Sequence, residues 1–313
     1  MKKISVIICT HNPQKAYIRR VLESLKEQTL PIQDWELLLI DNASTKKLCS
    51  EIDISWHINS RHIREDLIGL TNARLCGIRS SVNEILVFVD DDNMLEPNYL
   101  ENAYTIMKEN TSLGAIGGKI LPDFEVEPEN WIKDFWVCLA LRDLGEAVQT
   151  YFYNKQTSDD MQHPLFAPIG AGMVLRKSAA IFYADTIAND LSRKALDRTG
   201  NSLQSGGDCD INLTLLKTGW GVGYFPQLKL THLISASRLT KDYLARLNYA
   251  SCRSWIQVLD FHNIRPWSKI PAWSVLPRKL KSFFSYQTWK SPEAFIHWKG
   301  SCGTFEALAN LDK

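Results

Sequence analysis

Residues 85–93 read ILVFVDDDN, an apolar run that ends in three consecutive aspartates, Asp90, Asp91 and Asp92. A run this apolar is typical of a strand that is buried on both faces in a parallel sheet. Carboxylates gathered at its end are costly unless a cation offsets their repulsion. A hard divalent cation is the expected compensator, because such ions sit between one or two carboxylates and a substrate's phosphates. The alternative is an acidic turn that caps the helix expected from about Pro97.

Apolar strands and amphipathic helices alternate along the first 110 residues. The expected strands cover residues 4–9, 35–40, 54–58 (the weakest) and 85–90, and the expected helices lie near residues 18–25, 70–80 and 100–107. Strands that alternate with helices over short connections indicate an α/β protein with a mostly parallel central sheet flanked by helices.

Three of these strands end in small polar or acidic residues. They are Thr10 and Asn12 after the first strand, Asp41, Asn42 and Ser44 after the second, and the three aspartates. In open α/β sheets, ligands bind in the crevice outside the carboxyl ends of the strands. We therefore expect one pocket there. The chain has no GxGxxG after its first strand and no GxxxxGK[ST], which argues against a dinucleotide-binding fold and a P-loop.

The second half of the chain is less regular. Residues 121–165 show little periodicity and are expected to be irregular cover over the sheet. A strand is expected at residues 173–176, and a helix that begins at Gly206 and ends at Gly219. Residues 221–231 predict a final pair of short strands, which ends at His232.

The composition excludes several classes of protein. The 313 residues are 45% hydrophobic and carry a net charge of +1, which argues against nucleic-acid binding. Seven scattered cysteines without a CxxC pair fit a reducing compartment and offer no zinc framework. No stretch approaches the roughly 18 apolar residues of a transmembrane helix, and the first apolar run is too short for a signal peptide. We expect a cytoplasmic protein, with peripheral contact to the inner face of the membrane as an alternative.

Residues 236–313 differ from the rest of the chain and are expected to be mainly helical. They hold 12 Lys and Arg against 5 Asp and Glu, and five of the ten tryptophans. Leu276, Leu280, Phe283 and Phe284 follow one another at helical spacing among basic residues. This combination suits contact with anionic lipid. The alternative is a helical lid packed on the core, with solvated lysines.

Seven sequence blocks together resemble inverting family 2 glycosyltransferases with the GT-A fold. The blocks are SVIICTHN at 5–12, LLLIDNAS at 37–44, GLTNARLCGI at 69–78, FVDDDN at 88–93, GAGMVLRK at 170–177, GGDCDINL at 206–213 and LTH at 230–232. They follow the family's order and approximate spacing. The resemblance implies a GT-A catalytic domain at 1–235 with a C-terminal helical extension at 236–313.

The resemblance implies transfer of a sugar from a nucleotide diphosphate donor to an acceptor hydroxyl, with inversion at the anomeric carbon. The three aspartates match the family's DXD motif, which holds Mg²⁺ or Mn²⁺ on the donor diphosphate. Asp92 is then the metal ligand, Asp90 lies near the ribose, and Asp91 belongs to the same nucleotide site or is structural. His232 matches a histidine that completes the metal or diphosphate site in some GT-A enzymes, although a structural role is the alternative. Arg238 is expected to close on the diphosphate as a mobile cation.

Further donor contacts follow from the same resemblance. Asp41 matches the acidic residue that contacts the nucleobase, typically an N–H of uracil, which favours a UDP-sugar. Thr10 and Asn12 match the loop beneath the nucleotide, and Asn42 lies beside Asp41; helix capping and turn formation are the alternatives. Arg74 lies where the family often carries an arginine near base or phosphate, although Leu75 replaces the usual asparagine and a surface ion pair is the alternative.

Asp208 is the predicted general base. Inverting transfer needs a carboxylate to take the acceptor's proton, and the family supplies it from a Glu-Asp pair that opens a helix. Asp208 stands at the Asp position, Gly207 replaces the Glu, and Asp210 fits a second acidic position, from which it is expected to contact the nucleotide-sugar. The alternative is that these aspartates only stabilise the helix N-terminus.

The implied partners are a nucleotide-diphosphate sugar and a glycan or lipid-linked acceptor of the bacterial cell envelope. One alternative is a sugar-phosphate nucleotidyltransferase, but such enzymes carry a glycine-rich basic loop after strand one, where this chain has THNPQK. The other is a catalytically silent relative, which Gly207 and Leu75 keep open.

Overall fold

Strand β4 (Ile85–Asp90), which ends in the first aspartate, lies near the middle of the sheet, between β1 (Ile4–Thr10) and β8 (Val174–Arg176). A computed structural model describes residues 3–155 and 161–311 of the chain. Strands β1 and β4 are parallel, and their register places Cys9 beside Asp90. Every residue of β4 before Asp90 is buried, as the apolar run predicts.

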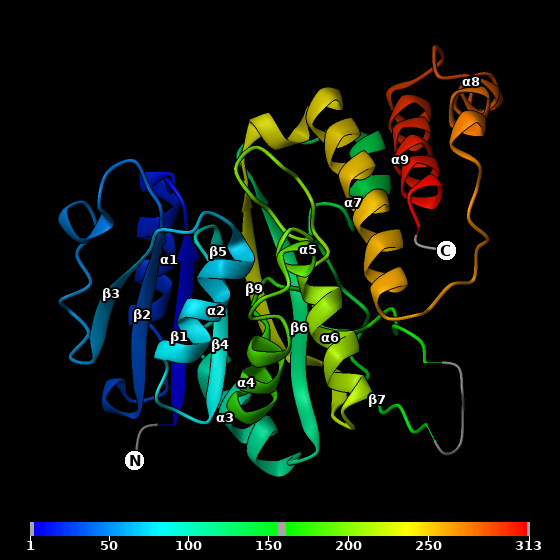
Figure 1. Ribbon diagram of the computed structural model, residues 1–313. Coiled ribbons are helices and arrows are strands. Elements are labelled where there is room, and N and C mark those ends of the chain that lie inside the picture. Colours follow the sequence, from blue (N-terminus) through cyan, green and yellow to red (C-terminus); the bar gives the residue numbers. More distant parts are fainter. Residues whose placement is uncertain (1–2, 156–160, 312–313) are drawn as a thin grey trace.

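The described residues form a nine-stranded sheet in the order β3-β2-β1-β4-β8-β6-β9-β5, with β7 paired to β9 (Figure 1). The other strands are β2 (Trp35–Asn42), β3 (Ser60–Glu65), β5 (Asn93–Leu95), β6 (Leu113–Phe124), β7 (Gln149–Tyr151) and β9 (Gly221–Ile234). Strand β8 is antiparallel to both β4 and β6, and β5 and β7 are antiparallel to β9. The other six strands run in one direction, so the predicted mostly parallel α/β sheet is confirmed.

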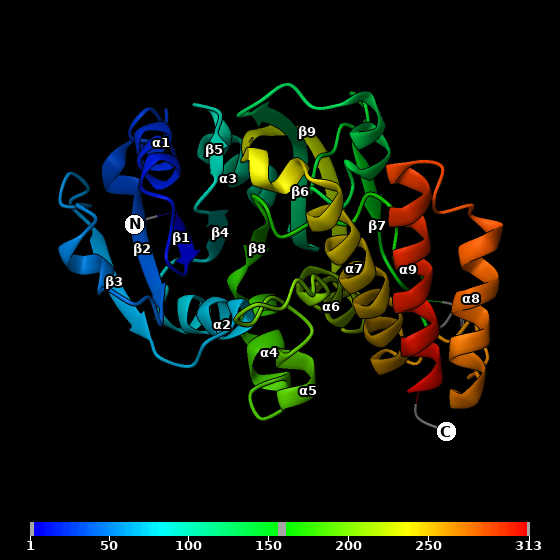
Figure 2. The same cartoon turned by 90° about the horizontal axis from the view of Figure 1, so that it is seen from above.

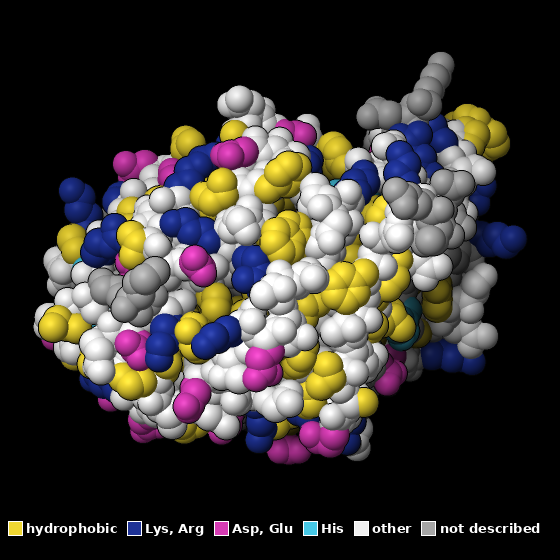
Figure 3. All heavy atoms as spheres, turned by 90° about the horizontal axis from the view of Figure 1, so that it is seen from below, with side chains coloured by type: hydrophobic (Ala, Val, Ile, Leu, Met, Phe, Trp, Pro, Cys, Tyr) yellow, Lys and Arg dark blue, Asp and Glu magenta, His cyan; other side chains and the backbone are white. Residues whose placement is uncertain are grey.

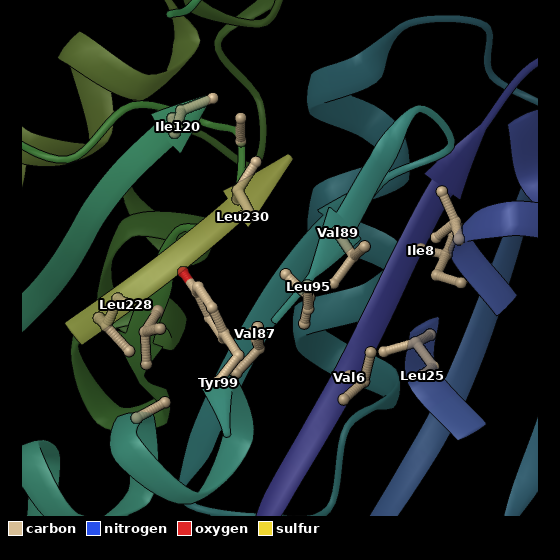
Figure 4. Packing of buried hydrophobic residues seen from close by; sticks show 14 of the residues in the cluster. Val6, Ile8, Leu25, Val87, Val89, Leu95, Tyr99, Ile120, Leu228 and Leu230 are labelled. Atoms are coloured by element: carbon tan, nitrogen blue, oxygen red, sulfur yellow. The ribbon is translucent and has the colours of Figure 1, made fainter. Parts of the chain in front are cut away.

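Helices cover both faces of the sheet, because its central strands carry apolar side chains on both faces. The helices of the core are α1 (Lys15–Lys26), α2 (Leu70–Ser80), α3 (Tyr99–Glu109), α4 (Lys177–Thr186), α5 (Leu191–Lys194) and α6 (Gly207–Lys217). Val6 and Ile8 of β1 pack in one cluster with Leu25 of α1 and Tyr99 of α3 (Figure 4). Ile7 lies in a second cluster, with residues of α2, α4 and α6. This alternation follows from the two-residue period of a strand.

Three long helices follow the core: α7 (Lys241–Phe261), α8 (Val275–Ser285) and α9 (Pro292–Ala309). Helix α7 buries Leu244 in the first core cluster and Val258 in the second, so it joins this extension to the core. Helix α9 packs on α7, and α8 lies outermost (Figure 2). The expected C-terminal helices are confirmed, while the division at residue 235 stays a prediction. Among the described residues, no helix combines the length and the apolar character needed to cross a bilayer.

Short 3-10 helices connect several of these elements. They are η1 (Ile32–Asp34), η2 (Leu48–Ser50), η3 (Asn130–Phe135), η4 (Ala236–Leu239) and η5 (Ala272–Ser274). Helix η2 is followed by a segment where the prediction was wrong. A strand was expected at residues 54–58, but these residues form turns, and the strand in this part of the chain is β3. Trp56 and His57 pack their rings on Trp35 instead of pairing in the sheet. Strand β3 has the sequence SRHIRE and lies at the edge of the sheet. It has too few apolar residues to be recognised as a strand from the sequence.

Two expectations for the second half were also wrong. Strand β6 continues to Phe124, into the segment expected to be irregular; its last four residues are half-exposed and include Pro122. Strand β9 is one strand of 14 residues and not a pair. Its pairing with β6 shifts register between Gly117 and Lys119, which separates two ladders along the same strand.

Gly118, at that register shift, generates a stability prediction. A Cβ there would lie 1.9 Å from the Leu228 carbonyl oxygen, a backbone atom that cannot move aside alone. We expect Gly118→Ala to lower the free energy of unfolding by about 2–3 kcal/mol, measured by urea denaturation. The adjacent Gly117→Ala is the control, since its Cβ would approach only Pro168, at 3.3 Å, and should cost under about 1 kcal/mol. Equal losses in the two variants would contradict this packing account.

Candidate active site

A cavity of about 530 Å³ lies at the carboxyl ends of β1, β2 and β4, where the strand-end pattern predicted it. Nine of the twelve predicted site residues line it: Thr10, Asn42, Arg74, Asp90, Asp91, Asp92, Asp208, His232 and Arg238. Asn12, Asp41 and Asp210 are not among its lining residues. The fold therefore gathers the aspartate triplet and the predicted base around one space.

The three aspartates have different surroundings. Burial raises the pKa of Asp90, and Arg74 opposes this rise. Burial and the neighbouring Asp92 raise the pKa of Asp91 to about 7, against a hydrogen bond from the Thr10 hydroxyl. Three adjacent carboxylates in a buried setting cannot all stay charged without cations, so their neighbours decide which one does.

Asp92 is the carboxylate that is held in its charged form. Burial alone would raise its pKa, but His232 and Arg238 outweigh burial and lower the pKa well below its usual range. Its Oδ2 lies 3.2 Å from His232 Nε2 and 2.9 Å from Arg238 Nη1. Strand pairing fixes this contact, because Asn93 of β5 stands opposite His232 of β9.

Arg74 is a buried cation shared by several acids. Its Nη1 lies 2.8 Å from Asp197 Oδ2, and its guanidinium lies 5.7 Å from the Phe88 ring centroid. Burial opposes its charge, but the attraction of Asp197, then of Asp90 and Asp208, outweighs burial and raises its pKa. Arg74 is therefore not the surface ion pair that a lone helix arginine suggests.

Asp208 lies in the first turn of α6 and lines the cavity. Its Oδ2 accepts the backbone N–H of Gly170 at 3.0 Å, and its Oδ1 accepts that of Cys209 at 2.8 Å. A Cβ at the preceding Gly207 would lie 2.2 Å from Asp197 Oδ2. Asp197 thus fills the space that a side chain at position 207 would take, which is a physical reason for glycine there.

Asp41 and Asn12 stabilise the turn after β2 instead of lining the cavity. Asp41 accepts the backbone N–H groups of Ser44 and Leu48 at 3.0 and 3.1 Å, and Arg64 Nη1 at 2.8 Å. Burial would raise the pKa of Asp41, but these bonds together lower it. Asn12 Oδ1 accepts the N–H of Thr45 at 2.9 Å. The predicted nucleotide contacts of both residues rest on the family resemblance alone.

Asp210 is fully buried on another side of α6. It pairs with Arg193 of α5 at 2.8 Å, and accepts from Tyr183 of α4 at 3.2 Å and from His262, after α7, at 2.8 Å. Four helical segments meet at this one carboxylate. Its environment fits a structural role, and its predicted donor contact also rests on the resemblance alone.

The sequence did not identify Asp197 and Arg198 as site residues, yet both line the cavity. They lie between α5 and α6, in a segment without periodicity or motif. Burial opposes the charge of Arg198, but Tyr243, Asp197 and Asp92 outweigh it and raise the arginine's pKa. His11 also lines the cavity, with its Nδ1 2.7 Å from the Asn42 carbonyl oxygen. It stood within a matched block, but no role was assigned to it.

The residues around Asp92 fit a divalent cation in part. Asp92 Oδ2 and His232 Nε2 face each other, and His232 Nδ1 is buried without a partner among the described residues. No group of three His, Cys, Asp or Glu that could hold a metal occurs within residues 3–155 and 161–311. Mg²⁺ commonly takes one or two protein ligands and completes its shell with phosphate oxygens and water. Two ligands facing the cavity are compatible with that arrangement.

Comparison with known proteins supplies the family. The family described as "Glycosyl transferase family 2" matches residues 5–182, more than half of the chain. The chain belongs to glycosyl transferase family 2. The matched segment contains the aspartate triplet and Arg74, and Asp208 lies beyond its end.

The named relatives have low sequence identity to this chain, and each alignment covers only part of the two proteins. The chain is 21% identical over 174 residues to the glucosyl-dolichyl phosphate glucuronosyltransferase of Haloferax volcanii, which covers 54% of this chain and 55% of that protein. It is 30% identical over 120 residues to poly(ribitol-phosphate) beta-N-acetylglucosaminyltransferase TarP of Staphylococcus aureus, with coverage of 37% and 36%. The match thus spans about half or less of each relative.

A solved structure shares the fold over nearly the whole chain. Residues 1–349 of Staphylococcus aureus TarS, crystallised in complex with UDP, align with a TM-score of 0.52 and 14% identity. The alignment covers 98% of this chain and 89% of that one. The predicted GT-A fold is confirmed by this match together with the observed sheet.

The two aspartates of α6 should differ in what they stabilise. Asp210→Ala leaves Arg193 buried without its carboxylate, so we expect a loss of about 3–5 kcal/mol in the free energy of unfolding. Asp208→Ala removes a carboxylate at the cavity wall and should cost under about 1 kcal/mol. Urea denaturation of both variants measures this difference. A loss from Asp208→Ala as large as that from Asp210→Ala would contradict the assignment.

Proposed function

We propose that this chain is a metal-dependent inverting glycosyltransferase that moves a sugar from a nucleotide-diphosphate sugar to an acceptor hydroxyl. The observation that carries the proposal is one cavity lined by both the aspartate triplet and Asp208, in a member of glycosyl transferase family 2. A reaction with an anionic leaving group and a neutral nucleophile needs positive charge at one place and a base at another. The cavity offers both.

Asp208 acts as the general base in this proposal. Its carboxylate lines the cavity, and backbone N–H groups of Gly170 and Cys209 hold the two carboxylate oxygens in place. The carboxylate takes the acceptor's proton while the acceptor oxygen attacks the anomeric carbon opposite the leaving group. Asp210 has no part in this step, since it is fully buried and is not among the cavity's lining residues.

Asp92 and His232 would hold the metal. Mg²⁺ or Mn²⁺, when bound there, supplies positive charge for the departing nucleoside diphosphate. Arg238 Nη1 lies 2.9 Å from Asp92 Oδ2 and 3.0 Å from His232 Nε2, so it holds these two groups together. Arg238 would have to release Asp92 and His232 for these two residues to hold a metal, and its guanidinium would then be free to contact the diphosphate. Arg74 and Arg198 add fixed positive charge to the same cavity.

UDP is the favoured nucleotide. The structural neighbour TarS has been crystallised with UDP and with UDP-GlcNAc, which supports a uridine donor for this chain. The names of two relatives describe transfer to poly(ribitol-phosphate) and to glucosyl-dolichyl phosphate, which supports a similar class of acceptor for this chain. We therefore propose a glycan or lipid-linked glycan as acceptor. All seven cysteines are free thiols, which fits the cytoplasm as the place of reaction.

The products distinguish this proposal from its alternatives. Incubation with UDP-sugars and Mn²⁺ should release UDP, by transfer or by slow hydrolysis. A nucleotidyltransferase would release pyrophosphate from UTP and a sugar phosphate. UDP binding without turnover of any UDP-, GDP- or dTDP-sugar would indicate a silent relative.

Asp92→Ala and Asp208→Ala should separate donor binding from transfer. The first variant loses the metal ligand, so the Mn²⁺-dependent part of the thermal shift with UDP should disappear. The second keeps that shift but should lose transfer by roughly 10²–10⁴-fold, since a base is removed. The exposed Asp134→Ala is the matched control and should behave like wild type. An unchanged Mn²⁺-dependent shift in Asp92→Ala would show that the metal site is assigned to the wrong residue.

Arg238→Ala tests the proposed exchange between guanidinium and metal. Without Arg238, Asp92 has one cation fewer, so Mn²⁺ alone should bind more tightly, by roughly tenfold in calorimetry. UDP in saturating Mn²⁺ should bind more weakly, because the guanidinium that faces the diphosphate is lost. Tighter binding of UDP as well as Mn²⁺ would contradict the role of Arg238 at the diphosphate. Weaker binding of Mn²⁺ would contradict the competition between Arg238 and the metal for Asp92.

A further inference from the structure

Helix α8 presents an apolar face to solvent. Leu276, Leu280 and Phe284 recur every four residues and are 75%, 58% and 58% exposed. No residue of α8 is buried. A surface helix of a globular protein normally turns its apolar stripe to the core. Here the stripe points outward.

Two exposed tryptophans flank this helix in the sequence. Trp289 is 61% exposed, and its ring centroid lies 6.0 Å from that of Phe284. Trp273, just before α8, is 79% exposed. We call these five side chains the α8 patch: Trp273, Leu276, Leu280, Phe284 and Trp289. Large apolar side chains gathered on one surface mark an interaction site.

The α8 patch is not needed to hold the helix in place. The opposite side of α8 packs on α9, where the rings of Phe283 and Trp298 lie 5.2 Å apart. Trp298 Nε1 also donates to the Lys279 carbonyl oxygen at 2.9 Å. Nor is α8 a lid over the active site, because none of the cavity's lining residues follows Trp255 in the sequence.

The surroundings of the patch are basic. Residues 261–291 contain six Lys and Arg and no Asp or Glu. Within the described part of the chain, Lys281, Lys290 and Lys269 form no ion pair, while Lys279 pairs with Glu306 of α9. On the face seen from below, basic side chains project at the edge where the C-terminal helices lie (Figure 3). This charge suits an anionic partner.

We propose that the α8 patch binds the surface of an anionic phospholipid membrane. The leucines and Phe284 enter the boundary between headgroups and acyl chains, and the two tryptophans lie at headgroup depth, where their amphipathic rings are favoured. Lys281 and Lys290 remain at the phosphates. A second copy of this chain fits less well, because pairing through α8 would bring two segments of the same charge together. The inference does not depend on the proposed reaction.

Vesicle co-sedimentation of the full chain tests the proposal. The vesicles are phosphatidylcholine alone, or phosphatidylcholine with about 30% phosphatidylglycerol. Leu276→Ser/Leu280→Ser removes part of the apolar face, and its control is Ile58→Ser/Leu191→Ser, at positions 77% and 78% exposed elsewhere. Lys281→Glu/Lys290→Glu reverses charge at the patch.

The matched charge control is Lys46→Glu/Lys47→Glu, in an exposed turn after β2. We expect wild type and both controls to bind anionic vesicles and to be released by salt. Both patch variants should bind at least roughly tenfold more weakly, with unchanged thermal unfolding. Three results would overturn the proposal: no binding by wild type, equal binding to neutral vesicles, or patch variants that bind like their controls. Self-association of wild type that is lost in the patch variants, without vesicle binding, would assign the surface to a second copy.

Discussion

The structure depends on compensation of the negative charge at the end of β4. Three consecutive, half-buried carboxylates lie at the end of a strand whose other residues are buried, and their mutual repulsion is costly. The compensating cations come from separate parts of the chain: Arg74 from α2, Arg198 from the segment before α6, and Arg238 from η4, with the His232 ring of β9 beside Asp92. Each of these side chains lies near the aspartates only in the folded chain.

This constraint explains why the second half of the chain wraps around the first. The pairing of β5 with β9 is short, yet it places His232 beside Asp92 across some 140 residues of sequence. A backbone hydrogen bond of 2.8 Å from Leu233 to Asp92 reinforces the contact. Arg74 and Asp197 join α2 to the segment between α5 and α6 in the same way. The charges that serve the site also join the two halves of the core.

Sequence reasoning succeeded where signals are local. Strands buried on both faces are continuous apolar runs, so the central strands and their polar ends were predictable, and with them the position of the cavity. It failed where the signal is long-range. Arg198 and Asp197 carry no local pattern, and Asp210 could be told from Asp208 only by seeing which side of α6 each one occupies. The polar edge strand β3 and the half-exposed end of β6 gave too little periodicity to be recognised.

Central to the proposed function is that Asp92 would hold a metal beside the donor nucleotide and would give up its contact with Arg238 to do so. A crystal structure with UDP and Mn²⁺, with anomalous data collected at the manganese edge, tests this most directly. We predict an anomalous peak in the cavity beside an Asp92 carboxylate oxygen and the UDP diphosphate, with Arg238 moved away from Asp92. A manganese peak that contacts neither Asp92 nor the diphosphate, or UDP bound with the Asp92–Arg238 pair intact, would contradict it.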